Sequence, residues 1–380
     1  MPSTITIDYT PAIEQGGGIG RYVRELVGAL AQQTVDEFDY KLFVAGASQQ
    51  QLPPPPAAHF DWKSTRITPR WFARVWHRLR LPVPLELFTG RTALYHATDF
   101  VLLPTLPATR TLLTVHDLSF VRVPDAAAPS LKAYLDTVVP RSVKAATHIL
   151  ADSQATKDDL IALYNTPADK ITVLLSGVEP RFKPVTNADV LLTIRNRYTL
   201  GLRPYILSLG TVQPRKNYER LVQSLARLRA SGQDVDLVIV GGKGWLEGPL
   251  YQTIQQLQLE DHVHITGFAD DADLPALYSA ATCFALPSLY EGFGIPVLEA
   301  MACGTPVVTS NISSLPEVAG DAALLVNPYN VEELTSALTR LITDDTLRQQ
   351  LITRGFTQAS RFTWDRAAQQ LLKVYQKLLS

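Results

Sequence analysis

Residues 283–306, CFALPSLYEGFGIPVLEAMACGTP, form the stretch that decides the fold. The apolar run Cys283–Leu286 has the length and composition of a buried strand, and a glycine bend follows it at 291–294. Pro296 stands where the first turn of a helix tolerates proline. Because a strand, a tight turn and a helix follow one another directly, this stretch predicts a βα unit of a parallel sheet.

The same alternation continues in both directions along the chain, which predicts parallel sheets with helices on both faces. In the first half we expect a helix over 19–33 and strands at Ile5–Asp8, Tyr40–Ala45, Leu94–Ala97, Thr111–His116 and His148–Ala151. In the second half we expect helices over 217–231, 249–259, 296–303 and 331–342, and strands at Tyr205–Leu209, Leu237–Val240, His262–Thr266, Cys283–Leu286, Pro306–Thr309 and Ala323–Val326.

The length of 380 residues is more than one ordinary hydrophobic core accommodates, so two domains are expected. The segment 176–184 lies between the two series of strands and combines turn residues with two prolines. We therefore predict an α/β protein of two Rossmann-like, doubly wound parallel-sheet domains that face a central cleft. Their predicted bounds are 1–185 and 186–360, and a final helix at 361–380 is expected to return toward the first domain.

The composition is that of a well-packed soluble protein, since 46% of the residues are hydrophobic, 19% are charged and the formal net charge is −1. No global field recruits nucleic acid, and no apolar run approaches the ~18 residues that span a bilayer. Cys283 and Cys303 lack a CxxC spacing, which predicts buried thiols and no zinc site. The N-terminal residues are strand-like and lack the features of a signal peptide, so we expect a cytoplasmic protein.

The glycine bend at 291–294 is a candidate anion site. Its glycines let backbone amides approach a ligand, and the helix behind it directs unpaired N–H groups to the same place, which stabilises an anion by roughly 0.3–2 kcal/mol. Glu299, at the start of the second helical turn, suits a ribose diol because both hydroxyls donate. The alternative is a glycine-rich connector with two solvated acids, Glu291 and Glu299.

A second candidate is GTVQPRKN at 210–217, which follows a predicted strand. Arg215 offers a bidentate fork and Lys216 a point charge, and fixed cations stabilise negative charge that develops on a leaving diphosphate. Both stand near a predicted helix start, where the helix dipole disfavours cations unless an anion is bound. The alternative is an ordinary pair of surface cations.

Two further candidates lie in the first half. His116 ends a predicted strand, where side chains of parallel sheets face a ligand crevice, although a lone histidine is usually structural. The loop GGGIGR at 16–21 opens a predicted helix, so Gly17 and Gly18 allow close approach of a phosphate or a sugar. Its glycines miss the GxGxxG register at Arg21, which argues against nicotinamide chemistry. A structural tight turn is the alternative.

The segment 66–91 carries six arginines and one acid, Glu86. Residues 70–80 within it predict a helix with one aromatic and apolar arc opposite its basic side chains. An interfacial helix on an anionic membrane fits this pattern, but we favour a surface helix whose aromatic face fills the first domain's core. The arc consists of Trp71, Phe72, Val75, Trp76 and Leu79.

Together these stretches resemble the retaining glycosyltransferases of family 4, which have the GT-B fold. The Glu-x7-Glu pattern from Glu291 to Glu299 is the most recognisable signature of that family. Many relatives carry arginine directly after the first glycine of GTVQPRKN, where this chain has Thr211, so Arg215 would supply most of the guanidinium contact. Other landmarks occur in their usual order: GGGIGR at 16–21, TVHDL at 114–118, ADSQAT at 151–156, SGVE at 176–179 and LGTVQPRKN at 209–217.

The resemblance implies an enzyme that moves a hexose, with mannose favoured, from a nucleotide-diphosphate sugar to a glycan or lipid-linked acceptor without a metal ion. It implies that Glu291 binds hydroxyls of the donor sugar, that Glu299 binds the ribose and that His116 donates a hydrogen bond to the sugar. Arg215 and Lys216 would face the diphosphate. The other implied donor contacts are Gly17, Gly18, Gly210, Thr211, Gly292, Phe293, Gly294 and Ile295.

The donor, the acceptor and some alternatives stay open. GDP-mannose is favoured because the GTxxPRKN form is typical of many mannosyltransferases, while UDP-sugars and dTDP-rhamnose remain candidates. Another GT-B enzyme such as a sugar-nucleotide epimerase or phosphorylase, a non-catalytic nucleotide-sugar-binding protein and a dehydrogenase are the competing functions. No nucleic-acid partner is expected, and 66–91 is the one candidate for peripheral contact with the inner membrane face. The D-x-D strings at 234–236 and 271–273 are interpreted as a strand start and a helix-capping turn.

Overall fold

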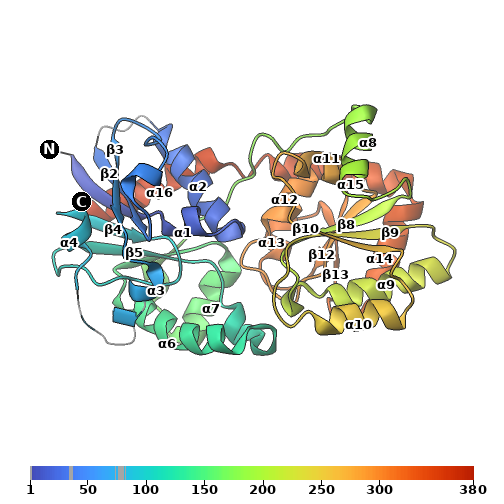
Figure 1. Ribbon diagram of the computed structural model, residues 1–380, viewed down its shortest axis with the longest axis horizontal. Coiled ribbons are helices and arrows are strands. Elements are labelled where there is room, and N and C mark those ends of the chain that lie inside the picture. Colours follow the sequence, from blue (N-terminus) through green and yellow to red (C-terminus); the bar gives the residue numbers. More distant parts are fainter. Residues whose placement is uncertain (1, 34–36, 73, 76–80, 82) are drawn as a thin grey trace. The chain divides into compact units, whose positions relative to one another are not determined.

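A computed structural model describes residues 2–33, 37–72, 74–75, 81 and 83–380. The chain forms two compact units, and each contains its own parallel sheet (Figure 1). The first unit comprises Met1–Leu118, Ala133–Gly177 and Thr363–Ser380. The second comprises Ser119–Lys132 and Val178–Phe362.

The sheet of the first unit has seven strands in the order β3-β2-β1-β4-β5-β6-β7, and every neighbouring pair is parallel. The order reverses between β1 and β4, because the chain moves outward through β2 and β3 before it returns to the other side of β1. The strands are β1 (Ser3–Asp8), β2 (Phe38–Ala45), β3 (Phe60–Thr65), β4 (Leu94–Ala97), β5 (Arg110–Val115), β6 (His148–Ala151) and β7 (Ile171–Val173).

Helices cover both faces of this sheet, with α2 and α16 on one side and α6 and α7 on the other (Figure 1). The last helix packs against α2, and its Tyr375 hydroxyl lies 2.8 Å from Nδ1 of His96 on β4. The helices that contribute to this unit are α1 (Thr10–Glu14), α2 (Gly18–Ala31), α3 (Pro69–Phe72), α4 (Glu86–Thr89), α6 (Pro129–Ala145), α7 (Gln154–Tyr164) and α16 (Trp364–Leu379).

The sheet of the second unit has six parallel strands in the order β10-β9-β8-β11-β12-β13, and its order reverses between β8 and β11. The strands are β8 (Tyr205–Leu209), β9 (Asp236–Val240), β10 (Val263–Gly267), β11 (Cys283–Leu286), β12 (Val307–Ser310) and β13 (Ala323–Val326). The helices are α5 (Ser119–Arg122), α8 (Ala188–Arg197), α9 (Tyr218–Ala230), α10 (Gly248–Gln256), α11 (Leu274–Ser279), α12 (Ile295–Ala302), α13 (Leu315–Ala319), α14 (Val331–Thr343) and α15 (Asp345–Ala359).

The core of the second unit shows why these segments form strands and helices. The side chains of β8, β9 and β11 are buried on both faces, so these strands appear in the sequence as continuous apolar runs. Helices α9 and α14 pack together and contribute Leu221, Leu225 and Leu338 to one hydrophobic cluster. Their apolar residues recur at helical spacing, as expected for helices that bury one face.

All eleven predicted strands are confirmed, with their ends shifted by no more than two residues. The edge strands β3 and β7 are not predicted, because Phe60–Thr65 alternates with polar residues and Ile171–Val173 is only three residues long. Cys283 and Cys303 are free and buried as predicted. The tetraproline at 53–56 is an exposed connection between β2 and β3.

The predicted helix over 70–80 is partly outside the structure, because residues 73 and 76–80 lie outside the described residues. Helix α3 ends at Phe72, whose side chain is buried, whereas the adjacent Trp71 is 55% exposed. The favoured interpretation, in which one aromatic face fills the core, is therefore wrong for Trp71. Neighbouring residues of a helical turn point about 100° apart, so of these two aromatic residues Phe72 reaches the interior and Trp71 does not. No helix within the described ranges is long and apolar enough to cross a membrane.

Candidate active site

The second sheet offers a site where its strand order reverses. Strands β8 and β11 are neighbours, yet the chain leaves them toward opposite edges of the sheet. In open parallel sheets, ligands bind beside the carboxyl ends of the strands at such a reversal. The loops that follow these two strands are 210–217 and 287–294, the two stretches in which the sequence predicts anion-binding residues.

The side chains of Arg215, Lys216 and Glu291 meet at this point. Nη1 of Arg215 lies 2.7 Å from Oε2 of Glu291, and Nζ of Lys216 lies 2.7 Å from Oε1 of the same carboxylate. Lys216 and Glu291 are buried, with 8% and 7% of their surface exposed. The structure thus brings Glu291 to two predicted catalytic residues, Arg215 and Lys216, that lie 76 and 75 positions before it in the sequence.

In this triad two cations face one carboxylate. Burial alone raises the pKa of Glu291, but the Arg215 and Lys216 charges outweigh it and lower that pKa to about 2. The carboxylate is therefore ionised at neutral pH and offsets one of the two cations. A site with two cations and one anion attracts a further anion, and the fork of Arg215 suits a phosphate.

Gly210 determines how Lys216 reaches the carboxylate. The backbone of Gly210 has a φ of 142°, and a Cβ atom there would lie 2.8 Å from Cε of Lys216. The lysine stem therefore runs across the bare Cα of this glycine, where any other residue would displace it. The hydroxyl of Tyr218 donates to the Gly210 carbonyl, and Thr211 next to it is half-buried.

The glycine bend ends at Gly294, whose φ of 112° lies in the left-handed region at the start of α12. Within the described residues, the backbone amides of Gly292, Phe293, Gly294 and Ile295 donate no hydrogen bond to another group. Such amides at a helix start are the groups that bind anions in other α/β proteins. The predicted donor contacts of the bend thus lie on the same loop as Glu291 of the triad.

Three polar side chains that hold the bend were not predicted from the sequence. The Ser314 hydroxyl donates to the carbonyls of Glu291 and Phe293, and the Glu291 amide donates to Oγ of Ser313. The Asn217 side-chain amide donates to the carbonyls of Pro287 and Pro328. The two serines follow β12, so their position at the carboxyl edge of the sheet was the signal that could have identified them.

Glu299 lies one turn deeper than the bend and is fully buried. The Tyr278 hydroxyl donates to its Oε2 at 2.8 Å. The carboxylate is therefore part of a buried polar contact between α11 and α12, and its binding of a ribose stays a prediction.

The remaining predicted residues lie in the first unit, where Gly17 and Gly18 follow β1 and His116 follows β5. Gly17 and Gly18 begin α2, and added Cβ atoms would meet nothing within 4 Å. Nδ1 of His116 lies 2.7 Å from Oδ2 of Asp152, and its Nε2 lies 2.9 Å from the Thr98 carbonyl oxygen. Both ring nitrogens therefore have hydrogen-bond partners within the first unit. The hydrogen bond from His116 to a sugar stays a prediction.

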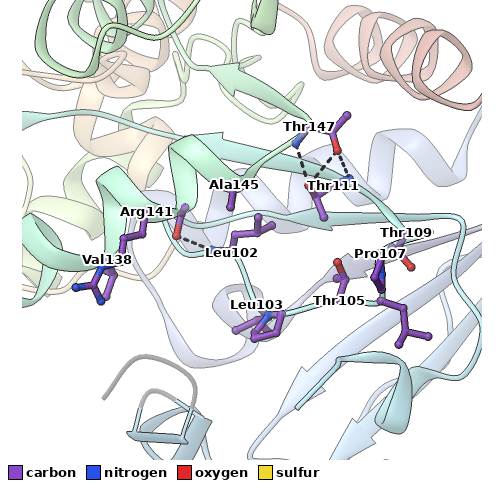
Figure 2. A pocket seen from close by; sticks show the side chains of 13 residues that line it. Leu102, Leu103, Thr105, Pro107, Thr109, Thr111, Val138, Arg141, Ala145 and Thr147 are labelled. Carbon is purple, nitrogen blue, oxygen red and sulfur yellow. Dashed lines mark hydrogen bonds between the residues drawn. The ribbon is translucent and has the colours of Figure 1, made fainter. Parts of the chain in front are cut away.

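A separate pocket of about 600 Å³ lies at the amino ends of the strands of the first sheet (Figure 2). Thr109 and Thr111 line it at the amino end of β5, and Thr147 lines it just before β6. The hydroxyls of Thr111 and Thr147 lie 3.2 Å apart and also accept from each other's amides. Because this edge is opposite the carboxyl ends of the strands, the pocket is not part of the candidate site.

The acidic D-x-D strings have structural partners. Asp236 begins β9 and accepts a hydrogen bond from His262, which agrees with its interpretation as a strand start. Asp273 is the N-cap residue of α11, as the interpretation of a helix-capping turn expects, but its side chain accepts from Arg197 and Tyr198 and makes no capping bond. Within the described ranges, no three His, Cys, Asp or Glu side chains are grouped to hold a metal ion.

Comparison with known proteins identifies the family. The family Glycosyltransferase Family 4 matches residues 16–182, and Glycosyl transferases group 1 matches residues 193–358. The chain is 33% identical to the O-antigen chain mannosyltransferase B of Escherichia coli over 95% of this chain and 96% of that protein. This chain belongs to glycosyltransferase family 4.

Two further comparisons give a partial sequence match and a match of the fold. It is 32% identical to the serotype-specific mannosyltransferase WbdA of Escherichia coli over 61% of this chain, but only over 29% of that longer protein. The structure of Anabaena Alr3699/HepE in complex with UDP and glucose superposes with a TM-score of 0.72 over 99% of this chain and 100% of that chain, at 20% identity. The protein is therefore a glycosyltransferase with the GT-B fold.

Proposed function

We propose that this glycosyltransferase moves a hexose, with mannose favoured, from a nucleotide-diphosphate sugar to a glycan or lipid-linked acceptor and retains the anomeric configuration. The observation that carries the proposal is the buried triad, in which Arg215 and Lys216 outnumber the carboxylate of Glu291 at the reversal of the second sheet. Fixed cations at such a point stabilise the charge that develops on a departing diphosphate. They do so without a divalent ion.

The proposed reaction exchanges two bonds at the anomeric carbon. The bond from this carbon to the diphosphate oxygen breaks, and the acceptor oxygen bonds to the carbon on the same face. The acceptor proton passes to the departing diphosphate, so no enzyme side chain acts as a covalent nucleophile. Glu291 orients the sugar, while Arg215, Lys216 and the amides of Gly292–Ile295 hold the diphosphate.

GDP-mannose is the donor that we favour, and binding to a panel of nucleotide sugars tests this preference. The support is the GTVQPRKN form at 210–217 and the likeness to a mannosyltransferase over nearly the whole chain. At a concentration of 100 times its Kd, the correct donor stabilises the folded protein by about 2.7 kcal/mol. We expect GDP-mannose to raise Tm more than UDP-glucose or dTDP-rhamnose at equal concentration.

Product analysis separates this proposal from its alternatives. With GDP-mannose and an acceptor in the presence of EDTA, we expect a mannosylated product with the donor's anomeric configuration. An altered sugar nucleotide without acceptor would indicate an epimerase, and binding without turnover would indicate a binding protein. Equal stabilisation by all three donors would remove the preference for mannose.

A lipid-linked acceptor would require contact with a membrane, and we propose that 66–91 provides it. In this segment the apolar residues Trp71, Leu81 and Leu87 are exposed, and the basic residues Arg66 and Arg70 are exposed too. We expect the protein to sediment with vesicles of phosphatidylglycerol and not with vesicles of phosphatidylcholine, and Trp71→Ser to weaken this binding about tenfold. Leu202→Ser, at an 81% exposed leucine of the second unit, is the matched control and should bind as the wild type does.

A further inference from the structure

One buried hydroxyl group lies inside the glycine bend at 291–294. Oγ of Ser314 is 2.9 Å from the carbonyl oxygen of Glu291 and 2.7 Å from that of Phe293. Ser314 is fully buried and lies in the loop between β12 and α13. A carbonyl oxygen only accepts hydrogen bonds, so the serine is the donor, and both carbonyls point toward it.

The direction of these two carbonyls determines the direction of two amides. Within the described residues every peptide unit is trans, and its C=O and N–H bonds point in opposite directions. The Glu291 carbonyl shares a peptide unit with the Gly292 amide, and the Phe293 carbonyl shares one with the Gly294 amide. Because both carbonyls point to Ser314, both amides point away from it.

The peptide unit before them is oriented by two other contacts. The Glu291 amide donates to Oγ of Ser313 at 3.1 Å, and the Tyr290 carbonyl accepts from Nη1 of Arg215 at 2.7 Å. Both ends of this unit are therefore bound within the protein. The bend is thus held by the arginine of the triad and by the two serines that follow β12.

Ser310 provides a contrast, because it contacts the same loop and leaves no amide without an acceptor. It ends β12, is fully buried and donates to the Ser288 carbonyl at 2.7 Å. The amide of that peptide unit belongs to Leu289 and donates to the Arg215 carbonyl at 2.8 Å. Ser314, in contrast, holds two peptide units whose amides have no acceptor among the described residues.

We propose that Ser314 is a positioning residue of the diphosphate site. By holding two carbonyls, it keeps the amides of Gly292 and Gly294 directed outward as hydrogen-bond donors to phosphate oxygens. This role rests on the proposed function, in which the bend receives the diphosphate of the donor. Amides held in this way need no reorganisation when the anion binds. All of these contacts lie within the second unit.

Ser314→Ala removes the hydroxyl group and leaves the two carbonyls without their donor. We expect the Kd values for GDP and for UDP, measured by calorimetry, to weaken by the same factor of about tenfold. The factor is the same because the lost contacts concern the diphosphate and not the base, whichever nucleotide the wild type prefers.

The matched control is Ser310→Ala, which loses a hydroxyl group of equal burial from the same part of the chain. Its Kd values should stay within about twofold of the wild type, because the bond from Leu289 to Arg215 still holds the affected peptide unit. A purely structural role of Ser314 would weaken binding equally in the two variants or in neither. Either result overturns the proposal.

Nuclear magnetic resonance of Gly294 tests the amide itself. Phe293-Gly294 is the only Phe-Gly pair in the chain, so carbon-13 in phenylalanine carbonyls and nitrogen-15 in glycine isolate one amide signal. In the wild type we expect inorganic pyrophosphate and GDP each to shift this signal. In Ser314→Ala we expect the signal to be displaced without ligand and to respond less to both.

The outcomes of this measurement separate the inference from the proposed function. If the wild type binds GDP or UDP while the Gly294 signal stays in place, the inference fails and the proposed function stands. If the signal of Ser314→Ala responds as fully as that of the wild type, the positioning role fails. If neither nucleotide binds the wild type, both the inference and the proposed function fail.

Discussion

Replacing Lys216 with alanine is expected to lower kcat/KM for the donor by about 10²–10³-fold. The lysine ammonium lies 2.7 Å from Glu291 and Lys216 is 8% exposed, so water does not compensate for the loss of this charge. It acts where negative charge develops on the leaving diphosphate, so its loss raises the transition state more than the bound donor. The measurement is the rate of GDP release from GDP-mannose.

The matched control is Arg227→Ala, which removes a cation from the same unit. Arg227 pairs with Glu332 on the surface, and both side chains are largely exposed. Water and salt screen an exposed pair of this kind, so this variant should keep both its rate and its stability. A Lys216→Ala rate within a few-fold of the wild type would remove the lysine from the mechanism.

The sequence was sufficient to predict the fold because the physical signals were local. Each central strand is an apolar run bounded by a glycine or proline turn, and the βα unit at 283–306 repeats this pattern without interruption. The edge strands β3 and β7 are buried on fewer sides, so their sequences carry less of that signal. Their absence from the prediction left the sheet order incomplete at both edges.

The prediction of the site residues depended on the position of each residue relative to the strands. Arg215, Lys216 and Glu291 were recognisable because each lies in the loop that follows a strand, and parallel topology brings such loops to the same end of the sheet. Ser314 and Asn217 were not recognisable, because their role is to donate to backbone carbonyls of a distant loop. A hydrogen bond of this kind leaves no spacing pattern in the sequence. The same is true of Asp152, whose pairing with His116 depends on the neighbouring positions of β5 and β6.

Glu291→Gln is expected to lower the free energy of unfolding of the unliganded protein by about 3–5 kcal/mol, because it leaves two buried cations without their carboxylate. Glutamine has nearly the same shape, so the loss reports the charge and not a cavity. Its amide group also places donors against the donors of Arg215 or Lys216. The free energy is measured from the unfolding transition of the second unit in urea. Donor turnover is measured in parallel, and near-full activity of the variant would contradict the orienting role of Glu291.

A bound nucleoside diphosphate should reverse part of this loss, because its phosphates supply the missing negative charge. We expect GDP to raise Tm more in Glu291→Gln than in the wild type, relative to each unliganded protein. The same increment in both proteins would show that the diphosphate does not contact Arg215 and Lys216. This comparison separates an anion site from a structural ion pair.

The pH dependence of stability provides the final test of the triad. The pKa of Glu291 is about 2 in the folded protein, where Arg215 and Lys216 outweigh the effect of burial, and its ordinary value is 4.5. A lowered folded pKa means that the carboxylate contributes stability above pH 4.5, and that this contribution, about 3 kcal/mol, is lost as the pH falls toward 2. The wild type should therefore lose more stability than Glu291→Gln over this range, and parallel losses would show that the carboxylate is not held by the two cations. The cations that lower this pKa are the ones proposed to receive the diphosphate, so the titration measures in the free protein the field that the donor would meet.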